Sequence, residues 1–515
     1  MPPEISTEPS ERKLIRRRVS RRALLAGGVI GAQVAGAYAV LGDPLALFGS
    51  SGASDGPVGE AVRGDTKAIF KESVRISHLL RRTGFGVSPA EYDRYQGMGL
   101  QATLDELLNY DRIDDSEAVA AMQKAGEGIG LVPTVNSWLT RMAMTKRPLQ
   151  EKMTLFWHGL LTSQLSVVVD REAMEAQVDI YRQQALGSFP TILKAVWRDP
   201  AMMEYLNIDG SERNAPNENY ARELMELFAL GIGNFSEKDV REAARAFTGW
   251  HVPRQRGGRE GKYLLKTPVF RPQGFDRGMK TVLGKTGNFS PDDIVDIVVA
   301  QPASAQYIVR RLFEFLVYPN PTDAELEPFV EAYTKGDRSI RAAVEAILRS
   351  DVFYSPKAYR AFVKSPVEYT IGAIKALNGQ GQLEELTAGN PRLGGVTGQM
   401  GQTLYEPPDV AGWPGNTSWL NASTMFARIN FLNTVTGGAP NRRNPNATPA
   451  MGPRGLGTAA QALDHFVPLV LDDNISDEMR QLLVAYAGGA DSTLTPEKLR
   501  GLIYLVLASP QFHVC

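Results

Sequence analysis

The chain has 515 residues, of which 43% are hydrophobic and 22% are charged, with 56 basic side chains against 57 acidic ones. This composition excludes a disordered protein, a collagen-like protein and a multi-span membrane protein. The balance of charge argues against a general nucleic-acid binder, because such proteins carry a large basic excess. The single cysteine, Cys515, excludes an internal disulfide and a cysteine-based zinc or iron–sulfur site.

The N-terminus has the layout of an export signal. Seven positive charges in residues 12–22 precede an uncharged, moderately apolar run over 23–42. The stretch Ser20-Arg21-Arg22-Ala23-Leu24-Leu25 is similar to a twin-arginine signal, in which two arginines precede a mildly hydrophobic helix. We predict a signal peptide over 1–39, cut after Ala39, and a mature protein that is periplasmic or extracellular. An uncleaved membrane anchor is the alternative.

Cleavage after Ala39 changes the net charge of the protein. Removing residues 1–39 leaves 49 of the 56 basic and 54 of the 57 acidic side chains, so the mature protein is acidic by about five charges. This balance favours solubility. The twin-arginine route carries proteins that fold before they cross the membrane, often around a cofactor. The signal therefore raises the expectation of a bound metal or cofactor, although the sequence does not identify one.

Composition and apolar spacing divide the exported part. A Gly- and Ser-rich stretch predicts a flexible tether over 40–68, and a stretch dense in Pro, Gly and Asn predicts a linker over 437–457. Elsewhere apolar residues recur with helical spacing. We predict a mainly α protein with few or no strands: a large multi-helix domain over 69–436 and a C-terminal helical unit over 458–515. Residues 251–287 lack helix signals and predict a long loop or a small hairpin.

Capping residues mark several helix starts. A hydroxyl side chain that precedes a proline or an acid accepts hydrogen bonds from the free backbone N–H groups of the first helical turn. Such starts are predicted at Ser88, Ser236, Ser290, Thr322 and Thr495.

The densest group of chemically useful side chains lies on a predicted helix over 217–230, which Gly231 ends. Helical spacing places the apolar residues Tyr220, Leu224, Leu227 and Phe228 on one side of it and the charged residues on the other. Glu218, Arg222 and Glu226 are spaced four apart, so Arg222 can pair with both glutamates. Glu223 and Glu226 could share a proton or a cation. Carboxylates held together in this way raise a pKa for acid–base work or gather oxygen ligands for a hard metal. The alternative is a solvated face with intrahelical ion pairs.

Two aromatic-rich stretches are further candidates. His158 lies between large apolar residues in Phe156-Trp157-His158-Gly159, where a hydrogen-bonded core histidine is more common than a metal ligand. Trp413, on the Pro-rich loop 405–419, could stack on a sugar ring or an aromatic ligand, or pack within a rigid loop. The chain has five histidines and lacks the His-Glu-x-x-His, Gly-x-Ser-x-Gly, phosphate-loop and dinucleotide-binding motifs.

These segments together resemble one family. The matching motifs are His78-Leu-Leu-Arg-Arg-Thr-Gly-Phe-Gly, Phe156-Trp-His-Gly, Pro216-Asn-Glu-Asn-Tyr-Ala-Arg-Glu-Leu-Met-Glu-Leu-Phe, Arg241-Glu-Ala-Ala-Arg-Ala-Phe-Thr-Gly-Trp, Lys280-Thr-Val-Leu-Gly and Pro407-Pro-Asp-Val-Ala-Gly-Trp-Pro. They resemble the bacterial domain-of-unknown-function-1800 family over roughly residues 78–433. The resemblance implies an exported protein without a settled reaction. It also implies a partner: a co-exported, sulfatase-like protein of the domain-of-unknown-function-1501 family.

The chain departs from the family's motifs at two histidines. Family members commonly have His-Gly-His after the tryptophan, where this chain has Leu160, and His-Asp before the Lys-Thr stretch, where it has Phe275 before Asp276. A metal site that depended on those histidines would be lost here. The oxygen ligands that would remain are Glu218, Glu223, Glu226 and Asp276.

Two functions stay open at this point. The first is an exported hydrolase-type enzyme, whose candidate catalytic residues are Glu218, Glu223 and Glu226. The second is a non-catalytic binding or assembly partner of another exported protein, with the 405–419 loop as its contact surface. Arginines near the glutamates would hold an anionic group or orient the carboxylates, and His158 would support the site from behind. The candidate binding residues are Asn217, Arg222, Arg241, Arg245, Trp250, His158 and Trp413.

Overall fold

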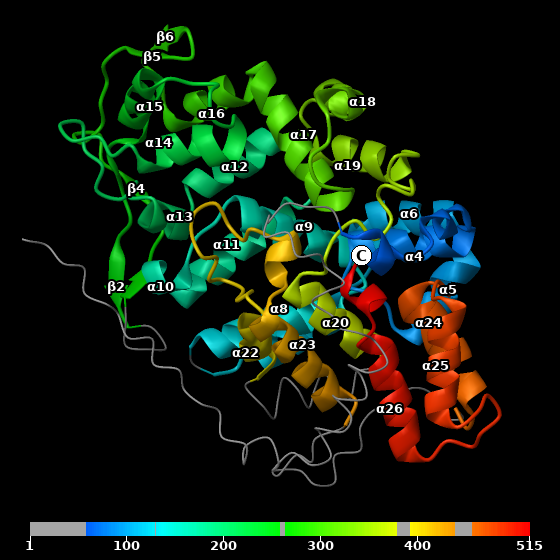
Figure 1. The fold of residues 1–515 in the computed structure, drawn as a ribbon. Coiled ribbons are helices and arrows are strands. Elements are labelled where there is room, and N and C mark those ends of the chain that lie inside the picture. Colours follow the sequence, from blue (N-terminus) through cyan, green and yellow to red (C-terminus); the bar gives the residue numbers. More distant parts are fainter. Residues whose placement is uncertain (1–57, 129, 258–262, 378–391, 438–455) are drawn as a thin grey trace, which may run out of the picture.

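The described part of the chain is built mainly of helices, which confirms the predicted fold class (Figure 1). The computed structural model describes residues 58–515 except 129, 258–262, 378–391 and 438–455. The predicted signal peptide and most of the predicted tether and linker lie outside these residues. Across the described ranges, no helix is long and apolar enough to span a bilayer.

The first group of helices includes α9 (Pro148–Leu160), whose side chains are nearly all buried and which packs against three other helices of the group, α4 (Glu72–Thr83), α6 (Leu100–Leu108) and α11 (Arg171–Gln183). Its two charged residues have partners, because an unpaired buried charge would lose its hydration without compensation. Glu151 accepts from Arg141 and Arg182, both at 2.6 Å, and Lys152 pairs with Glu368. This group comprises α3 (Glu60–Arg63), η2 (Thr66–Phe70), α4, α5 (Pro89–Met98), α6, η3 (Tyr110–Arg112), α7 (Ser116–Ala125), α8 (Leu131–Met144), α9, α10 (Leu165–Val168), α11, α12 (Phe189–Trp197) and α13 (Pro200–Tyr205).

The middle of the chain adds a second group of helices, several of which begin at predicted caps. Ser236, Ser290 and Thr322 form capping boxes in this group. Ser88 forms one in the first group, and Thr495, near the C-terminus, accepts from the backbone of Lys498, so all five predicted starts are confirmed. This group comprises α14 (Asn219–Glu223), η4 (Leu224–Ala229), α15 (Glu237–Ala244), η5 (Arg245–Phe247), α16 (Pro291–Val299), α17 (Pro302–Leu316), α18 (Asp323–Lys335), α19 (Ile340–Arg349), α20 (Pro366–Ala376), α22 (Arg392–Gln399), η6 (Asn416–Trp419) and α23 (Ala422–Val435).

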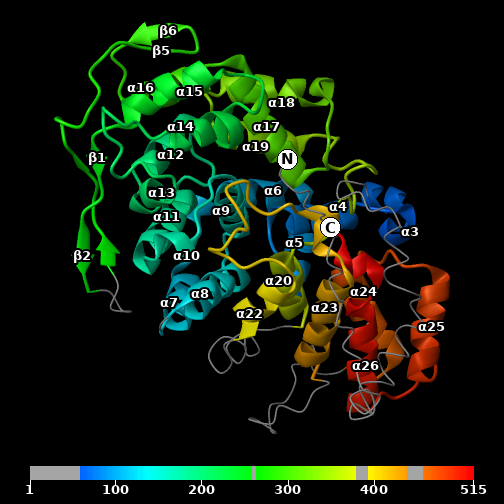
Figure 2. The same ribbon diagram turned by 60° about the vertical axis from the view of Figure 1, so that its left-hand side comes forward.

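Short strands occupy residues 250–287, where helix signals are weak. They form three antiparallel pairs, so the region contains hairpins rather than one long loop. Figures 1 and 2 place these strands at the edge of the molecule farthest from the C-terminal helices of residues 459–507. The pairs are β1 (Trp250–His251) with β4 (Val269–Phe270), β2 (Arg254–Arg256) with β3 (Tyr263–Leu265), and β5 (Lys280–Val282) with β6 (Lys285–Gly287).

The C-terminal helices pack against α20 and α23 (Figure 2). The last residues continue into the core, where Phe362 and Cys515 exchange two backbone hydrogen bonds of 3.1 and 2.8 Å. Apolar side chains from α4 to η7 form one continuous buried cluster, so these helices share a core with the rest of the chain. They are α24 (Ala459–Leu471), α25 (Asp477–Ala487), α26 (Pro496–Leu507) and η7 (Pro510–His513).

Candidate functional site

The helix over residues 217–230, called here the acidic helix, has the two sides that the sequence predicts. Tyr220, Leu224 and Phe228 are buried, whereas its charged side chains are partly exposed. From Leu224 the helix continues as the π-helical segment η4, which ends before Gly231 at a φ of 80°. The wider turn brings Leu227, predicted on the apolar side, to a half-buried position.

Arg222 is held between two carboxylates. Its guanidinium donates to both oxygens of Glu237 on α15, at 2.7 and 2.8 Å, and to Glu218 at 3.1 Å. The predicted pair with Glu218 is therefore present, and the second partner is Glu237 rather than Glu226. The fork of an arginine fits one carboxylate with two parallel bonds, so the neighbouring helix supplies the better-matched partner. Glu218, Arg222 and Glu237 together form a solvent-facing network in which two carboxylates face one guanidinium, so the charge of the arginine is neutralised and one negative charge remains.

Glu223 and Glu226 have no cationic partner within ion-pair distance among the described residues. Burial raises the pKa of Glu223, and the charge of Glu226 adds to that rise. A carboxyl group in this condition holds its proton to a higher pH and can act as a general acid. Asn217 lies just before the helix, where its side chain accepts from the backbone of Asn219 at 2.9 Å. Its observed role is to shape the turn.

The predicted arginines of α15 and η5 lie apart from this pair. Arg245 donates to Asp276 at 2.7 Å and to Glu242 at 2.9 Å. Asp276, a predicted oxygen ligand, is thus engaged by Arg245, and this arginine lowers its pKa. Arg241 is exposed on α15. Trp250 packs edge-on against Trp197, with ring centroids 5.0 Å apart, and so supports the strand region rather than the acidic helix.

His158 is fully buried in a cluster of aromatic rings. Its Nε2 accepts a hydrogen bond of 3.0 Å from the backbone N–H of Tyr405. Trp138, Tyr405 and Trp413 surround the imidazole, with centroids 5.3 to 5.7 Å away. Burial lowers the pKa of His158 to about 3, so the ring is neutral at ordinary pH. In the structure this histidine anchors the 405–419 loop to α9.

Other hydrogen bonds fix the same loop. The carbonyl of Tyr405 accepts from the backbone N–H of Leu165 at 2.9 Å, and that of Val410 accepts from Thr162 at 2.7 Å. Gly412 has a φ of 84°, and a Cβ at this position would lie 2.2 Å from the carbonyl oxygen of Gly159. Only glycine fits such an approach. The loop is therefore docked rigidly on the end of α9, and Trp413 follows directly.

A cavity of about 400 Å³, called here the aromatic cavity, opens between α9, α17 and the 405–419 loop. Its walls are mostly aromatic and aliphatic, and Asn320 and Pro414 at its edge are exposed. Three of the sequence motifs converge on it, through Arg82, through the end of α9, and through Trp413. Its lining is Arg82, Leu155, Phe156, Gly159, Leu160, Arg311, Glu314, Phe315, Pro319, Asn320, Phe362, Val363, Ser365, Glu368, Gln402, Trp413, Pro414, Gly415, Asn416 and Trp419.

The polar side chains of the aromatic cavity differ in whether their hydrogen-bond donors have acceptors within the protein. Arg82 donates to the carbonyls of Leu316 and Phe315, at 3.0 and 2.5 Å. Arg311 has a buried Nε–H with no acceptor among the described residues. Burial raises the pKa of Glu314, one turn further along α17. Sequence reasoning missed both residues of α17, because their spacing also fits an ordinary solvated helix face.

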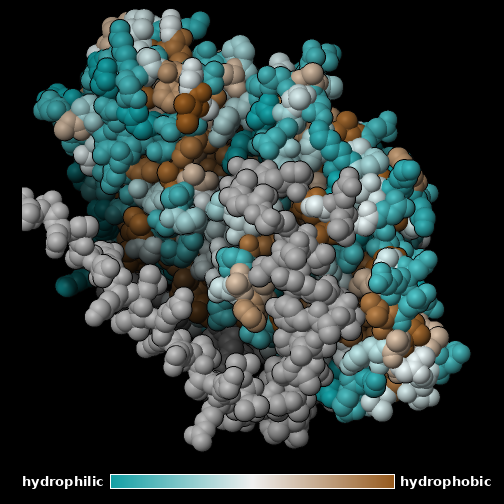
Figure 3. Space-filling view, in the orientation of Figure 1, coloured by the Kyte–Doolittle hydropathy of each residue, from teal (hydrophilic) through white to brown (hydrophobic). Residues whose placement is uncertain are grey.

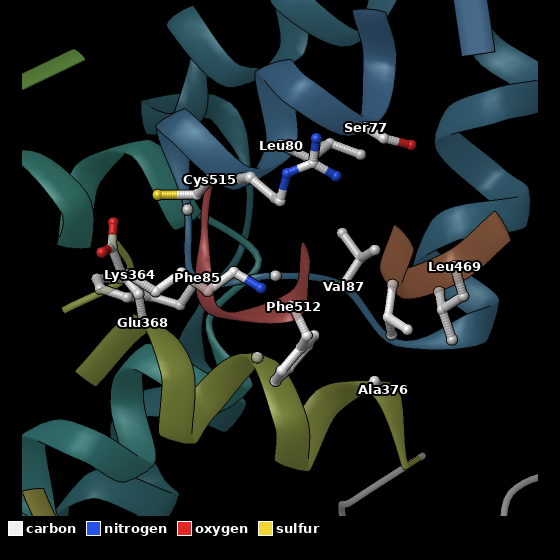
Figure 4. A pocket seen from close by; sticks show the side chains of 15 residues that line it. Ser77, Leu80, Phe85, Val87, Lys364, Glu368, Ala376, Leu469, Phe512 and Cys515 are labelled. Atoms are coloured by element: carbon white, nitrogen blue, oxygen red, sulfur yellow. The ribbon is translucent and has the colours of Figure 1, made fainter. Parts of the chain in front are cut away.

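A second cavity lies between α4, α20, α24 and η7 (Figure 4). Lys364 points into it, with Nζ 3.8 Å from the ring centroid of Phe512, and burial lowers the pKa of this lysine to about 7. The cavity measures about 30 Å³, which is room for one or two water molecules. It is too small for an organic ligand.

The described side chains do not form a metal cluster. Among them, no three His, Cys, Asp or Glu residues are placed to hold one ion. On the face drawn in Figure 3, hydrophilic residues cover most of the surface over α14–α18, with hydrophobic residues in small patches. The aromatic cavity and a more open hollow of about 450 Å³ beside Phe275 and Asp276 are both of ligand size, and residues 217–230 of the acidic helix line neither.

Comparison with known proteins identifies the family without an activity. No curated protein and no solved structure matches the chain. The family of proteins of unknown function DUF1800 matches residues 78–514. This range covers most of the chain and includes every motif of the aromatic cavity and of the acidic helix. The chain therefore belongs to the DUF1800 family.

Proposed function

We propose that the protein binds a small organic ligand in the aromatic cavity, after export by the twin-arginine route to the periplasm or the extracellular space. The observation that carries the proposal is the convergence of three separate sequence motifs on one enclosed space. Arg82, Phe156 and Trp413 are far apart in the chain, and the fold brings all three to the cavity wall. The predicted signal over 1–39 supports the location.

The cavity has the features of a preformed binding site. Its volume of about 400 Å³ lies within the roughly 300–1,000 Å³ range of small-molecule sites, and its lining combines aromatic walls with a few polar groups. The 405–419 loop is anchored by His158, Leu165 and Thr162 before any ligand arrives. Such preorganisation favours binding, because little further ordering is required.

The same loop is less suited to be a protein contact surface. Tyr405 and Trp419 expose only 3% and 6% of their area, and Trp413 packs on His158. Side chains that are already buried in the free protein have little area left to bury against a partner. The co-exported sulfatase-like partner nevertheless stays a proposal, supported by the family resemblance alone. Co-purification of the two exported proteins from cells that express both would test it, and separate elution at physiological salt would count against it.

Ligand-observed NMR on the mature protein tests the binding function. The probes are a panel of neutral sugars, sugar acids and aromatic acids. We expect at least one class to give saturable signals that Trp413→Ala abolishes. Trp250→Ala is the matched control, because this tryptophan packs on Trp197 outside the cavity. Melting curves of both variants establish that they fold. Equal binding by the wild type and Trp413→Ala would place the site elsewhere, and absence of binding by the whole panel would reject the proposal.

A hydrolase centred on the acidic helix is the second candidate, favoured by one specific observation. Glu223 has a raised pKa beside Glu226, and no cation neutralises either within ion-pair distance in the described chain. One of the two carboxyls would protonate a leaving group while the other, ionised, activates water. Glu223→Gln should then lower turnover of a chromogenic glycoside or ester about 10²- to 10⁴-fold, while Glu237→Gln leaves it nearly unchanged. Equal turnover by both variants would rule out this role.

A further inference from the structure

We infer that the aromatic cavity binds a sugar bearing an oxyanion, a carboxylate or a sulfate, with Arg311 as the partner of that group. The inference rests on the proposed binding function and adds the chemical class of the ligand. The ligand class follows from which hydrogen-bond donors of the cavity wall already have an acceptor in the protein and which have none.

Arg311 is the cation that the fold leaves without a partner here. Its Nε–H is buried and unpaired, and no carboxylate lies within ion-pair distance among the described residues, although the charge of Arg311 acts on Glu314 one turn further along α17. The adjacent Arg310 shows the ordinary arrangement, since it donates to the carbonyl of Pro321 and to Asp323, both at 2.5 Å. Arg311 as a whole is half-buried, and its terminal N–H groups also make no hydrogen bond within the described chain. A carboxylate or sulfate can accept from these groups with two parallel hydrogen bonds.

Two amide side chains in the cavity have free donors as well. The side-chain oxygen of Gln402 accepts from the backbone of Val367, and that of Asn416 accepts from Val363, each at 3.1 Å. These bonds fix which end of each amide faces the backbone. The NH₂ groups have no acceptor among the described residues and remain available at the cavity wall. Available donors of this kind suit the hydroxyl and ring oxygens of a sugar better than a purely apolar ligand.

The aromatic walls complete the match. Trp413 and Trp419 both line the cavity, and an indole face packs well against the C–H side of a sugar ring. Ring stacking, free amide donors and one unpaired guanidinium together describe an acidic sugar. Two carboxyl groups of the lining oppose an anion. Glu368 is paired with Lys152, and Glu314 lies on the same side of α17 as Arg311. Its raised pKa shows that burial already disfavours the charged form.

Calorimetric titration with matched sugar pairs tests the inference. The pairs are galacturonate with its methyl ester, and N-acetylglucosamine sulfate with N-acetylglucosamine. We expect the charged member of at least one pair to bind on the order of tenfold to a hundredfold more tightly than its neutral counterpart. The pair that shows the preference distinguishes a carboxylate from a sulfate ligand.

Three variants assign the preference to Arg311. Arg311→Gln should remove it, and Arg311→Lys, which keeps the charge but not the fork, should retain only part of it. Glu314→Gln should bind the charged sugar at least as tightly as the wild type, because it removes an opposing carboxylate. Arg310→Gln is the control and should behave as the wild type. Melting curves confirm that each variant folds.

The outcomes separate this inference from the proposed function. Equal affinity for charged and neutral sugars, or an unchanged preference in Arg311→Gln, would overturn the inference while ligand binding in the cavity stands. Binding of aromatic acids without any sugar would overturn the sugar assignment alone. Failure of all probes to bind, including the wider NMR panel, would reject both proposals.

Discussion

The acidic helix and the aromatic cavity hold their charged groups in opposite ways. On the helix, Arg222 meets two carboxylates near the solvent, and its charge is neutralised within the protein. In the cavity, Arg311 is partly buried and its Nε–H has no acceptor in the described chain. The acidic helix carries a dense group of charged side chains. An unsatisfied charge in an enclosed space is nevertheless the stronger indication of a ligand, because the protein leaves its hydrogen-bonding capacity unused.

The largest expected effect comes from the loop that closes the cavity. Gly412→Ala would place a Cβ 2.2 Å from the Gly159 carbonyl at a positive φ. We expect a loss of about 2–5 kcal/mol in the free energy of unfolding, from overpacking and backbone strain, together with loss of ligand binding. Gly415→Ala is the control in the same loop, where φ is 71° but no atom lies within 4 Å. It should lose only about 1–2 kcal/mol. Equal losses in urea denaturation would contradict the docked loop.

A pH effect is expected from the helix between the two regions. Asp199 caps α13. The charges of Asp409 in the loop and Glu223 on the acidic helix both act on Tyr205, the last residue of that helix. Burial raises the pKa of Asp199 to about 7. The folded state thus binds a proton that the unfolded state releases near pH 4, so this group stabilises the fold at pH 4 and loses its contribution as the pH rises through about 7.

Asp199→Asn tests the direction of this pH dependence of stability, because the amide is neutral at every pH and still accepts a hydrogen bond at the cap. Between pH 5 and 8 the wild type should lose on the order of a few kcal/mol that the variant keeps. The measurement is urea denaturation at pH 5, 6, 7 and 8. Parallel pH profiles for the two proteins would show that Asp199 is ionised in the folded state.

A smaller loss is expected when the anchor of the loop is removed. His158→Phe keeps the ring but leaves the Tyr405 N–H without its acceptor, which should cost about 1–3 kcal/mol. Burial lowers the pKa of the folded imidazole to about 3, whereas the unfolded chain protonates this histidine below about pH 6.5. The wild type therefore loses stability between pH 8 and pH 5 that the variant does not lose, so the cost of the substitution should be smaller at pH 5 than at pH 8. An equal cost at the two pH values would mean that the folded ring titrates like the unfolded one. A loss that grows as the pH falls toward 5 would mean that the folded protein carries the protonated ring.

The smallest effect is expected on the acidic helix. Arg222→Gln removes ion pairs that are largely exposed, so the loss should stay below about 1 kcal/mol and shrink at high salt. Arg182→Gln is the contrast, since this arginine pairs with the fully buried Glu151 and its loss should cost about 3–5 kcal/mol. Denaturation of both variants at low and high salt compares them. A large, salt-independent loss in Arg222→Gln would show that the helix face is more buried than described.

Part of the candidate site could be predicted from the sequence. Sequence reasoning predicted the two sides of the acidic helix, because a period of 3.6 residues sorts Tyr220 from Glu223 without any tertiary information. It also predicted the pair of Arg222 with Glu218, which are four residues apart. It did not predict Glu237 as the main partner of Arg222, since that contact depends on how α15 folds back. Arg311 and Glu314 carried no signal, because burial alone distinguishes them from exposed neighbours.

The sequence by itself determined the helical class, the capped helix starts, the division of the acidic helix and membership in the DUF1800 family. These depend on hydrogen bonds and spacings within a few residues, which the chain specifies locally. The tertiary structure alone decided that Arg82, Phe156 and Trp413 meet in one cavity and that Arg311 is left unpaired there. Such contacts join segments hundreds of residues apart, and packing of the whole core sets them.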